Sequence, residues 1–284
     1  MLEKGTDMYS FKPDFYADIR TEDRFTTAIS YLNGTLQESK TRTEVRTFLR
    51  VFDGKMWYYS STTDTDRVQE KLDELYAVAT PNPAIAEHPV VRRFEVNHDR
   101  LFQFENCSVR DVPMSKKNEL LQTFLPVLAI SPCMTMPSGT YVDRNSRFAF
   151  CSSLGADIAY DYQTCGIVMG CDMVEGERKF SAHWQMAKTV FGELGNTIDQ
   201  LRESMFEQLR FMRESVPAEP GDYPVILSPE AAGVFAHESF GHKSEADFML
   251  SDETMKEEWQ IGKTVGSPIL TISECGSLPG SGYT

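Results

Sequence analysis

The sequence of 284 residues lacks any long hydrophobic run and shows no export signal at its start. Apolar runs such as VLAI at 127–130 and VIL at 225–227 fall far short of the roughly 20 residues that cross a bilayer as a helix. The first fifteen residues lack the basic start and the apolar stretch of a secretory signal. We therefore expect no membrane association, and either a cytoplasmic protein or one whose leader has been removed.

The sequence also lacks a block of basic residues and a CxxC pair. It has 28 Lys and Arg against 42 Asp and Glu, a net charge of -14, so a polyanion would be repelled on average. Nucleic acid is therefore not expected as a partner. The six cysteines are scattered through a chain large enough to fold without disulfides, which predicts free thiols.

The first part of the chain has the pattern of an antiparallel β-meander followed by a helix. The dipeptides Asn33-Gly34 and Asp53-Gly54 suit two-residue hairpin turns, and β-rich runs flank them at 15–20, 25–32, 44–52 and 55–61. Apolar residues then recur at helical spacing until the prolines that begin at Pro81. We predict an α+β domain over residues 1–85.

The middle of the chain repeats the combination of strands and helices. A proline-rich linker at 81–89 precedes a predicted region 90–216. This region has a helix at 116–130, a second β-meander between 147 and 185, and a long helix at 198–216 with one apolar stripe. The predicted fold class is α+β, with antiparallel meanders that each pack against helices.

A third predicted domain, over residues 222–284, follows the second helical region at a proline-containing linker, residues 217–224. Short apolar runs at 225–227 and 269–272 predict strands. Few residues follow this linker, too few for a core of their own. We therefore interpret this part as the start of a β-rich domain that is truncated in this sequence.

Two of the five histidines, His237 and His242, lie in this third domain on a predicted helix that begins at Ser228-Pro229-Glu230. A zinc-binding pair on a helix usually has the spacing i and i+4, whereas the spacing here is i and i+5. On a regular helix, that spacing turns the second side chain about 140° away from the first. Gly241 offers two ways to bring the imidazoles together, a π-bulge or a left-handed helix end.

If the two imidazoles and one further ligand hold a zinc ion, a fourth position stays open for water. The metal lowers the pKa of that water to about 7, and Glu238 would be the general base that takes its proton. The expected chemistry is hydrolysis of a peptide bond.

The run from 225 to 247, with His237, Glu238, Gly241, His242, Glu245 and Asp247, resembles the H-E-x-x-x-H segment of the TldD/PmbA (TldE) family. The runs 16–20, 33–34 and 49–62 are similar to the opening domain of the family, and 265–280 resembles the strand and loop after its metal helix. The resemblance implies an α+β zinc metallopeptidase of the TldD type. It would act on unfolded or short peptides as a homodimer or a heterodimer.

The resemblance also implies roles for individual residues. His237 and His242 would be zinc ligands and Glu238 the general base, whereas the third ligand of the family is a cysteine far downstream, expected beyond Thr284. Cys275 is an alternative ligand that the sequence leaves open.

Other polar residues receive lesser roles. Glu245 and Asp247 are candidates for carboxylates that orient an imidazole. His88 and His98 are expected on the surface and His183 in a packed strand. The competing interpretation of the whole chain is a fragment, or a subunit without catalytic activity, that only folds and binds a partner. Because two imidazoles make a poor zinc site, we expect weak metal binding by residues 1–284 alone.

Overall fold

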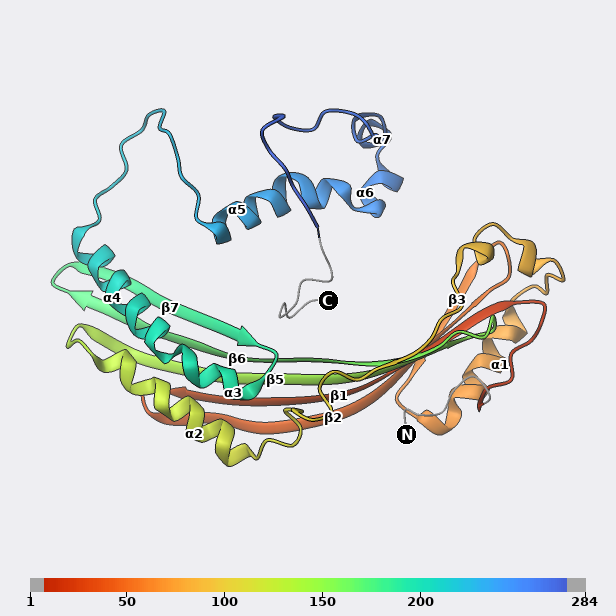
Figure 1. Cartoon of the computed structure of the whole chain (residues 1–284), viewed down its shortest axis with the longest axis horizontal. Coiled ribbons are helices and arrows are strands. Elements are labelled where there is room, and N and C mark those ends of the chain that lie inside the picture. The colour runs from red at the N-terminus through yellow and green to blue at the C-terminus, as the bar shows by residue number, and fades with distance from the viewer. Residues whose placement is uncertain (1–7, 275–284) are drawn as a thin grey trace. The chain divides into compact units, whose positions relative to one another are not determined.

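The computed structural model describes residues 8–274, which divide after Ser215 into two compact units. We call residues 8–215 the sheet unit and residues 216–274 the histidine unit. All strands of the described residues lie in the sheet unit (Figure 1).

One seven-stranded sheet, in the order β3-β2-β1-β5-β6-β4 with β7 also paired to β6, forms the sheet unit. Its strands are β1 (Tyr16–Leu32), β2 (Thr35–Phe52), β3 (Trp57–Thr62), β4 (His98–Leu101), β5 (Met134–Ser152), β6 (Asp157–Glu175) and β7 (Arg178–Lys188). Both predicted meanders are present, as β1-β2-β3 and β5-β6-β7, and the α+β class is confirmed.

The two meanders are joined into a single sheet by antiparallel pairing of β1 with β5. Asp18 lies opposite Ser152 at one end of this pairing, and Leu32 lies opposite Ser138 at the other. The regions 1–85 and 90–216 therefore share one sheet and do not each have their own. The division into three domains at the predicted boundaries stays a prediction.

The turns between strands follow the local sequence, with one difference. Asn33 and Gly34 form the predicted two-residue turn, with φ angles of 49° and 74°. The turn predicted at Asp53-Gly54 was wrong in length, because Phe52 pairs with Trp57 and four residues lie between them. The carboxylate of Asp53 explains the longer loop, since it accepts the amide hydrogens of Lys55 and Met56, both at 2.8 Å.

The α-helices of the sheet unit are α1 (Val68–Val78), α2 (Met114–Phe124), α3 (Phe191–Leu194) and α4 (Ile198–Glu214). Three of these four match predicted segments, whereas α3 was not predicted. A 3₁₀ segment, Leu125–Ala129, continues α2 up to the end of the predicted helix. Val216 was predicted on the apolar stripe of α4 but lies beyond its end and is 81% exposed.

The helices cover two parts of one face of the sheet. Ile19 and Ile29 lie ten residues apart on β1, so their side chains point to the same face. Ile19 packs in a core with Leu72 of α1, whereas Ile29 packs in a second core with Leu121 of α2 and Leu201 of α4. Between them on this face of β1 lie three polar residues and one aromatic residue, namely Thr21, Asp23, Phe25 and Thr27.

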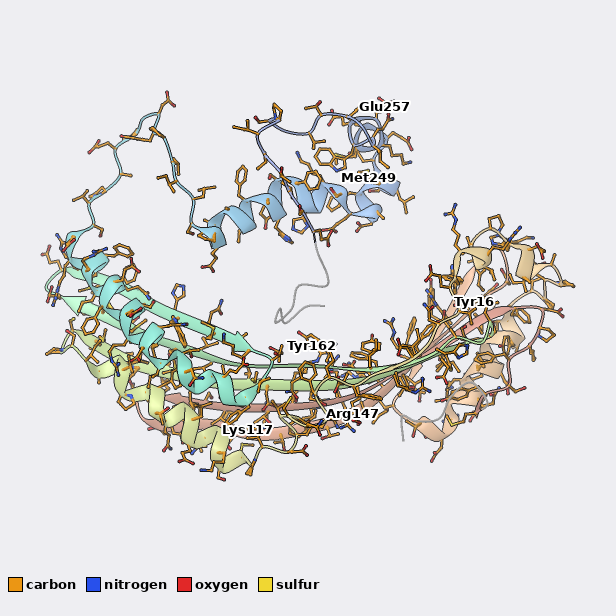
Figure 2. All side chains as sticks on the ribbon, viewed as in Figure 1. Tyr16, Lys117, Arg147, Tyr162, Met249 and Glu257 are labelled. Carbon is orange, nitrogen blue, oxygen red and sulfur yellow. The ribbon has the colours of Figure 1, made fainter. Side chains whose placement is uncertain are left out.

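A buried ion pair links α2 to this face. Lys117, labelled in Figure 2, lies 2.6 Å from Asp143 of β5, and both side chains are almost fully buried. Lys117 also donates to the hydroxyl of Thr27, and Tyr141 donates to Asp143. Burial raises the pKa of Tyr141, as does the neighbouring carboxylate, so its hydroxyl remains a donor.

The histidine unit contains α5 (Pro229–Ala236), a π-helical turn (His237–Gly241), a 3₁₀ turn (His242–Ser244), α6 (Ala246–Ser251) and α7 (Glu253–Glu258). The strands predicted at 225–227 and 269–272 were wrong, since both runs are irregular. A strand needs a neighbour for its backbone hydrogen bonds, and no strand lies in this unit among its described residues. Ile226 and Ile269 are accordingly 99% and 93% exposed.

The structure of residues 8–274 bears on two expectations from composition, namely free cysteines and the lack of a membrane-spanning helix. The five cysteines in this range are free thiols, as predicted, and Cys275 lies outside the described residues. None of the helices described is both long enough and apolar enough to span a bilayer.

Candidate metal site

The helix that carries the histidines begins as its sequence predicts. The hydroxyl of Ser228 accepts the amide hydrogen of Ala231 at 3.2 Å, Pro229 is the first helical residue, and Glu230 lies in the first turn. A side-chain cap, a preset φ angle and an acidic residue near the positive end of the helix dipole all favour a start at this point. The first histidine follows directly after the last residue of α5.

A π-helical turn brings the two imidazoles together. The amide of His242 donates to the carbonyl of His237, five residues earlier, where a regular α-helix would bond four residues back. The extra residue in the turn places the two rings with their centroids 4.4 Å apart. Gly241 has a φ angle of -56°, so of the two predicted arrangements the structure has the π-bulge and not the left-handed end.

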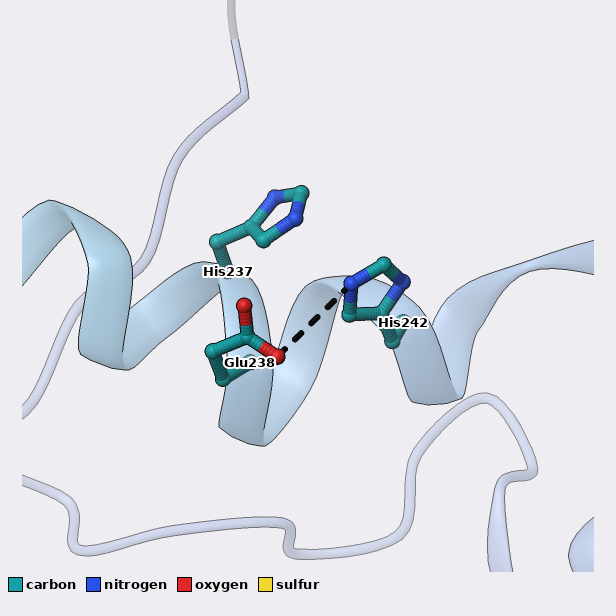
Figure 3. Close-up of side chains that lie close together, drawn as sticks. All are labelled: His237, Glu238 and His242. Carbon is teal, nitrogen blue, oxygen red and sulfur yellow. Dashed lines mark ion pairs between the residues drawn. The ribbon is translucent and has the colours of Figure 1, made fainter.

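The carboxylate of Glu238 completes a cluster with the two histidines (Figure 3). One candidate ligand atom from each residue lies within 4.8 Å of the other two, and Glu238 Oε2 is 3.7 Å from His242 Nε2. Two imidazole nitrogens with a nearby carboxylate suit a zinc ion. The side chains of Glu238 and His242 are 64% and 45% exposed, so the cluster is accessible to water.

Glu245 and Asp247, the two carboxylates expected to orient an imidazole, lie differently. Glu245 Oε1 is 2.5 Å from Nδ1 of His242, and this hydrogen bond raises the pKa of His242. A partner at Nδ1 leaves Nε2 as the ring nitrogen available to a metal. Asp247 accepts the amide hydrogen of Phe248 instead, and no contact with either histidine is found for it among the described residues.

Sequence reasoning missed the contribution of Trp259. Its indole nitrogen donates to the hydroxyl of Ser244 at 2.9 Å, and its ring packs 5.4 Å from that of Phe240. These contacts hold the end of α7 against the segment that carries His242. No sequence motif indicates that a tryptophan this distant in sequence from His242 supports its segment. Only the structure reveals the contact.

The remaining histidines do not join the cluster. His88 packs against Phe52 and accepts the amide hydrogen of Val90. His98 is exposed in β4, as expected, whereas the expectation that His183 is packed was wrong, since this residue is exposed in β7. Within residues 8–274, the group formed by His237, Glu238 and His242 is the one cluster of at least three candidate metal-binding side chains.

Two family models match this chain. The model described as PmbA/TldA metallopeptidase domain 1 matches residues 17–79, and the PmbA/TldA metallopeptidase C-terminal domain matches residues 220–284. The first match covers most of β1, β2, β3 and α1, and the second includes all three residues of the cluster.

Curated relatives of this chain are also named as metalloproteases. A metalloprotease of Methanocaldococcus jannaschii is 23% identical over 270 residues, which are 94% of this chain and 59% of the relative. A protein of Saccharolobus solfataricus named zinc metalloprotease TldD homolog is 29% identical over 165 residues, 56% of this chain and 35% of that protein. The chain therefore spans less than two thirds of the length of these relatives.

Solved structures share the fold. TldE from Thermococcus kodakarensis superimposes with a TM-score of 0.56 at 10% identity, over 72% of this chain and 46% of that one. A protein of Thermotoga maritima, named for a suggested role as modulator of a DNA gyrase, gives a TM-score of 0.57 at 13% identity over the same shares of the two chains. At these identities, the likeness concerns the fold alone.

Proposed function

Because the chain belongs to the TldD/PmbA family, whose matched domain models are described as metallopeptidase domains, we propose that it carries the catalytic segment of a zinc metallopeptidase. The observation that supports this function best is the π-helical turn, which places His237, Glu238 and His242 together despite their unusual spacing. In this proposal both imidazoles bind zinc, and Glu238 is the catalytic base.

The bound metal would supply a Lewis acid and lower the pKa of a water molecule. Glu238 is exposed and close to His242, so its carboxylate is placed to accept a proton from that water and to return it to the departing amine. Glu245 is a positioning residue, because its hydrogen bond to Nδ1 fixes the ring of His242 and leaves Nε2 free.

Several parts of this proposal extend beyond the described residues. Catalytic zinc sites normally have three protein ligands, and this cluster offers two imidazoles beside the proposed base. We place the third ligand in the part of the longer protein that relatives have and this sequence does not contain. We also propose a cytoplasmic enzyme that acts on short or unfolded peptides as a homodimer or a heterodimer.

Cleavage of an unfolded peptide by the full-length gene product tests the catalytic role of Glu238. Glu238→Gln should abolish cleavage and retain bound zinc, because the amide cannot take up the proton but both imidazoles remain. Glu230→Gln, on the same helix, is the matched control and should cleave normally. Unchanged cleavage by Glu238→Gln would exclude the carboxylate as the base.

A subunit without catalytic activity is the alternative function. It is consistent with the exposed position of the cluster. In that case the full-length protein would bind a partner subunit but would show neither stoichiometric zinc nor cleavage that depends on Glu238.

A further inference from the structure

The sheet unit contains a cavity of about 370 Å³, which lies entirely within residues 8–157. Three strands contribute its floor: Ile19 and Thr21 of β1, Val45 and Thr47 of β2, and residues 149–151 of β5. The first turns of the helical segment that leads into α1 form one wall. Met8 and Tyr9 contribute a second wall. The volume is within the range of small-ligand sites, roughly 300–1,000 Å³.

Hydrogen bonds fix the second wall in place. The side-chain amide of Gln69 accepts the amide hydrogen of Ser10 at 2.9 Å and donates to the carbonyl of the same residue. The amide of Lys12 donates to the hydroxyl of Tyr76. Hydrogen bonds near both ends of α1 therefore hold residues 8–12 against this helix, and the cavity has a defined shape.

The floor of the cavity offers a hydrogen-bond donor. The hydroxyls of Thr21 and Thr47 lie 3.0 Å apart, and Thr47 is 1% exposed. Two hydroxyls have two protons, but only one proton is used in the bond between them, and the other finds no acceptor within residues 8–274. A buried donor of this kind favours a ligand that presents an oxygen atom.

The wall of the cavity offers one free negative charge. Of its two carboxylates, Asp157 forms an ion pair with Arg100 at 2.8 Å. Asp66 is exposed and has no ion pair among the described residues. The lining also includes apolar side chains with exposed surface, Met8 and Val45 among them. A complementary ligand has a positive charge, an oxygen acceptor and an apolar group.

We infer that this cavity binds the amino-terminal residue of a short peptide when that residue has an apolar side chain. The α-ammonium group pairs with Asp66, the first carbonyl oxygen accepts the spare proton of the Thr21 and Thr47 pair, and the side chain packs on Met8 and Val45. This inference concerns the sheet unit alone and does not rest on the proposed peptidase activity.

Calorimetric titration of the tripeptide Leu-Gly-Gly into the chain tests the inference. The His237→Ala variant is the host for every measurement, so that neither cleavage nor binding at the histidines contributes. N-acetylation of the peptide should weaken binding up to about fivefold, the upper range for an ion pair with an exposed carboxylate. Asp66→Asn should weaken binding of the free peptide by a similar factor and leave the acetylated peptide unaffected.

Two further variants identify the site. Thr47→Val keeps the shape of the side chain and should weaken binding about fivefold, the effect of one neutral hydrogen bond. Glu74→Gln, on α1 but outside the cavity lining, should bind as the host does. Equal binding of the acetylated and free peptides, no detectable binding, or an equal loss in Glu74→Gln would overturn the inference.

Discussion

Leu72 of the sheet unit is fully buried, whereas Leu250 of the histidine unit is 78% exposed, and each is typical of its unit. The sheet unit has two large apolar cores under α1, α2 and α4. Within residues 216–274 of the histidine unit, by contrast, no residue is buried. The two units therefore differ in what stabilises them.

The comparison shows that the metal cluster is shaped by local interactions. A capped helix start, a five-residue backbone bond and the contact between Glu245 and His242 give the histidines their arrangement without a core beneath them. Such interactions define a geometry but stabilise it weakly. We expect the proposed dimer to cover the exposed apolar side chains of this unit.

Loss of the buried charge pair should produce the largest effect on the sheet unit. Lys117→Met leaves Asp143 without its partner in a buried position, so the free energy of unfolding in urea should fall by about 3–5 kcal/mol. Lys116→Met breaks the exposed pair with Glu119 and should cost less than about 1 kcal/mol. Equal losses in the two variants would contradict the account.

A matched pair of leucine truncations tests the comparison directly. Leu72→Ala should lower the free energy of unfolding by about 2–5 kcal/mol, because it leaves a cavity in a packed core. Leu250→Ala should change it by less than about 0.5 kcal/mol, since its side chain is exposed. The same urea titration serves both variants, and a large loss in Leu250→Ala would show that the histidine unit has a core of its own.

The helix start at Ser228 should matter only within the histidine unit. Ser228→Ala removes the hydroxyl that caps α5, a change worth about 1 kcal/mol of helix stability. Amide hydrogen exchange should become faster in residues 229–242 and stay unchanged in α4. Faster exchange in both places would mean that the two units unfold together.

Acid should reveal a smaller contribution from Glu22 in the sheet. Partial burial favours a raised pKa, but hydrogen bonds from Arg24, Ser146 and Arg144 outweigh it and lower the pKa of Glu22 to about 2. Its stabilisation is therefore complete above the ordinary pKa and is lost as the pH falls toward 2. Wild type should lose more stability than Glu22→Gln between pH 5 and pH 2.5, whereas Glu119→Gln should follow wild type.

Local features of the fold were predictable from the sequence because neighbouring residues determine them. The turn at Asn33-Gly34, the stripe of α4 and the start of α5 at Ser228 all depend on residues close in the chain. The pairing of β1 with β5 was not predictable, since it joins residues more than a hundred positions apart. The predicted strand at 225–227 failed because its apolar run carries no information about a partner strand.

The candidate site was predictable in its residues and only partly in its geometry. The five-residue spacing left two arrangements open at Gly241, and the backbone bond from His242 to His237 distinguishes them in the structure. The contact of Glu245 with His242 follows from a spacing of three residues, whereas the support from Trp259 depends on the packing of α7.

Zinc content of the full-length gene product, measured by mass spectrometry after dialysis, tests the central claim most directly. The account predicts one zinc ion per chain in wild type and in His183→Ala, and loss of zinc in both His237→Ala and His242→Ala. The absence of stoichiometric zinc from wild type, or its retention in both histidine variants of the cluster, would contradict the assignment of His237 and His242 as metal ligands.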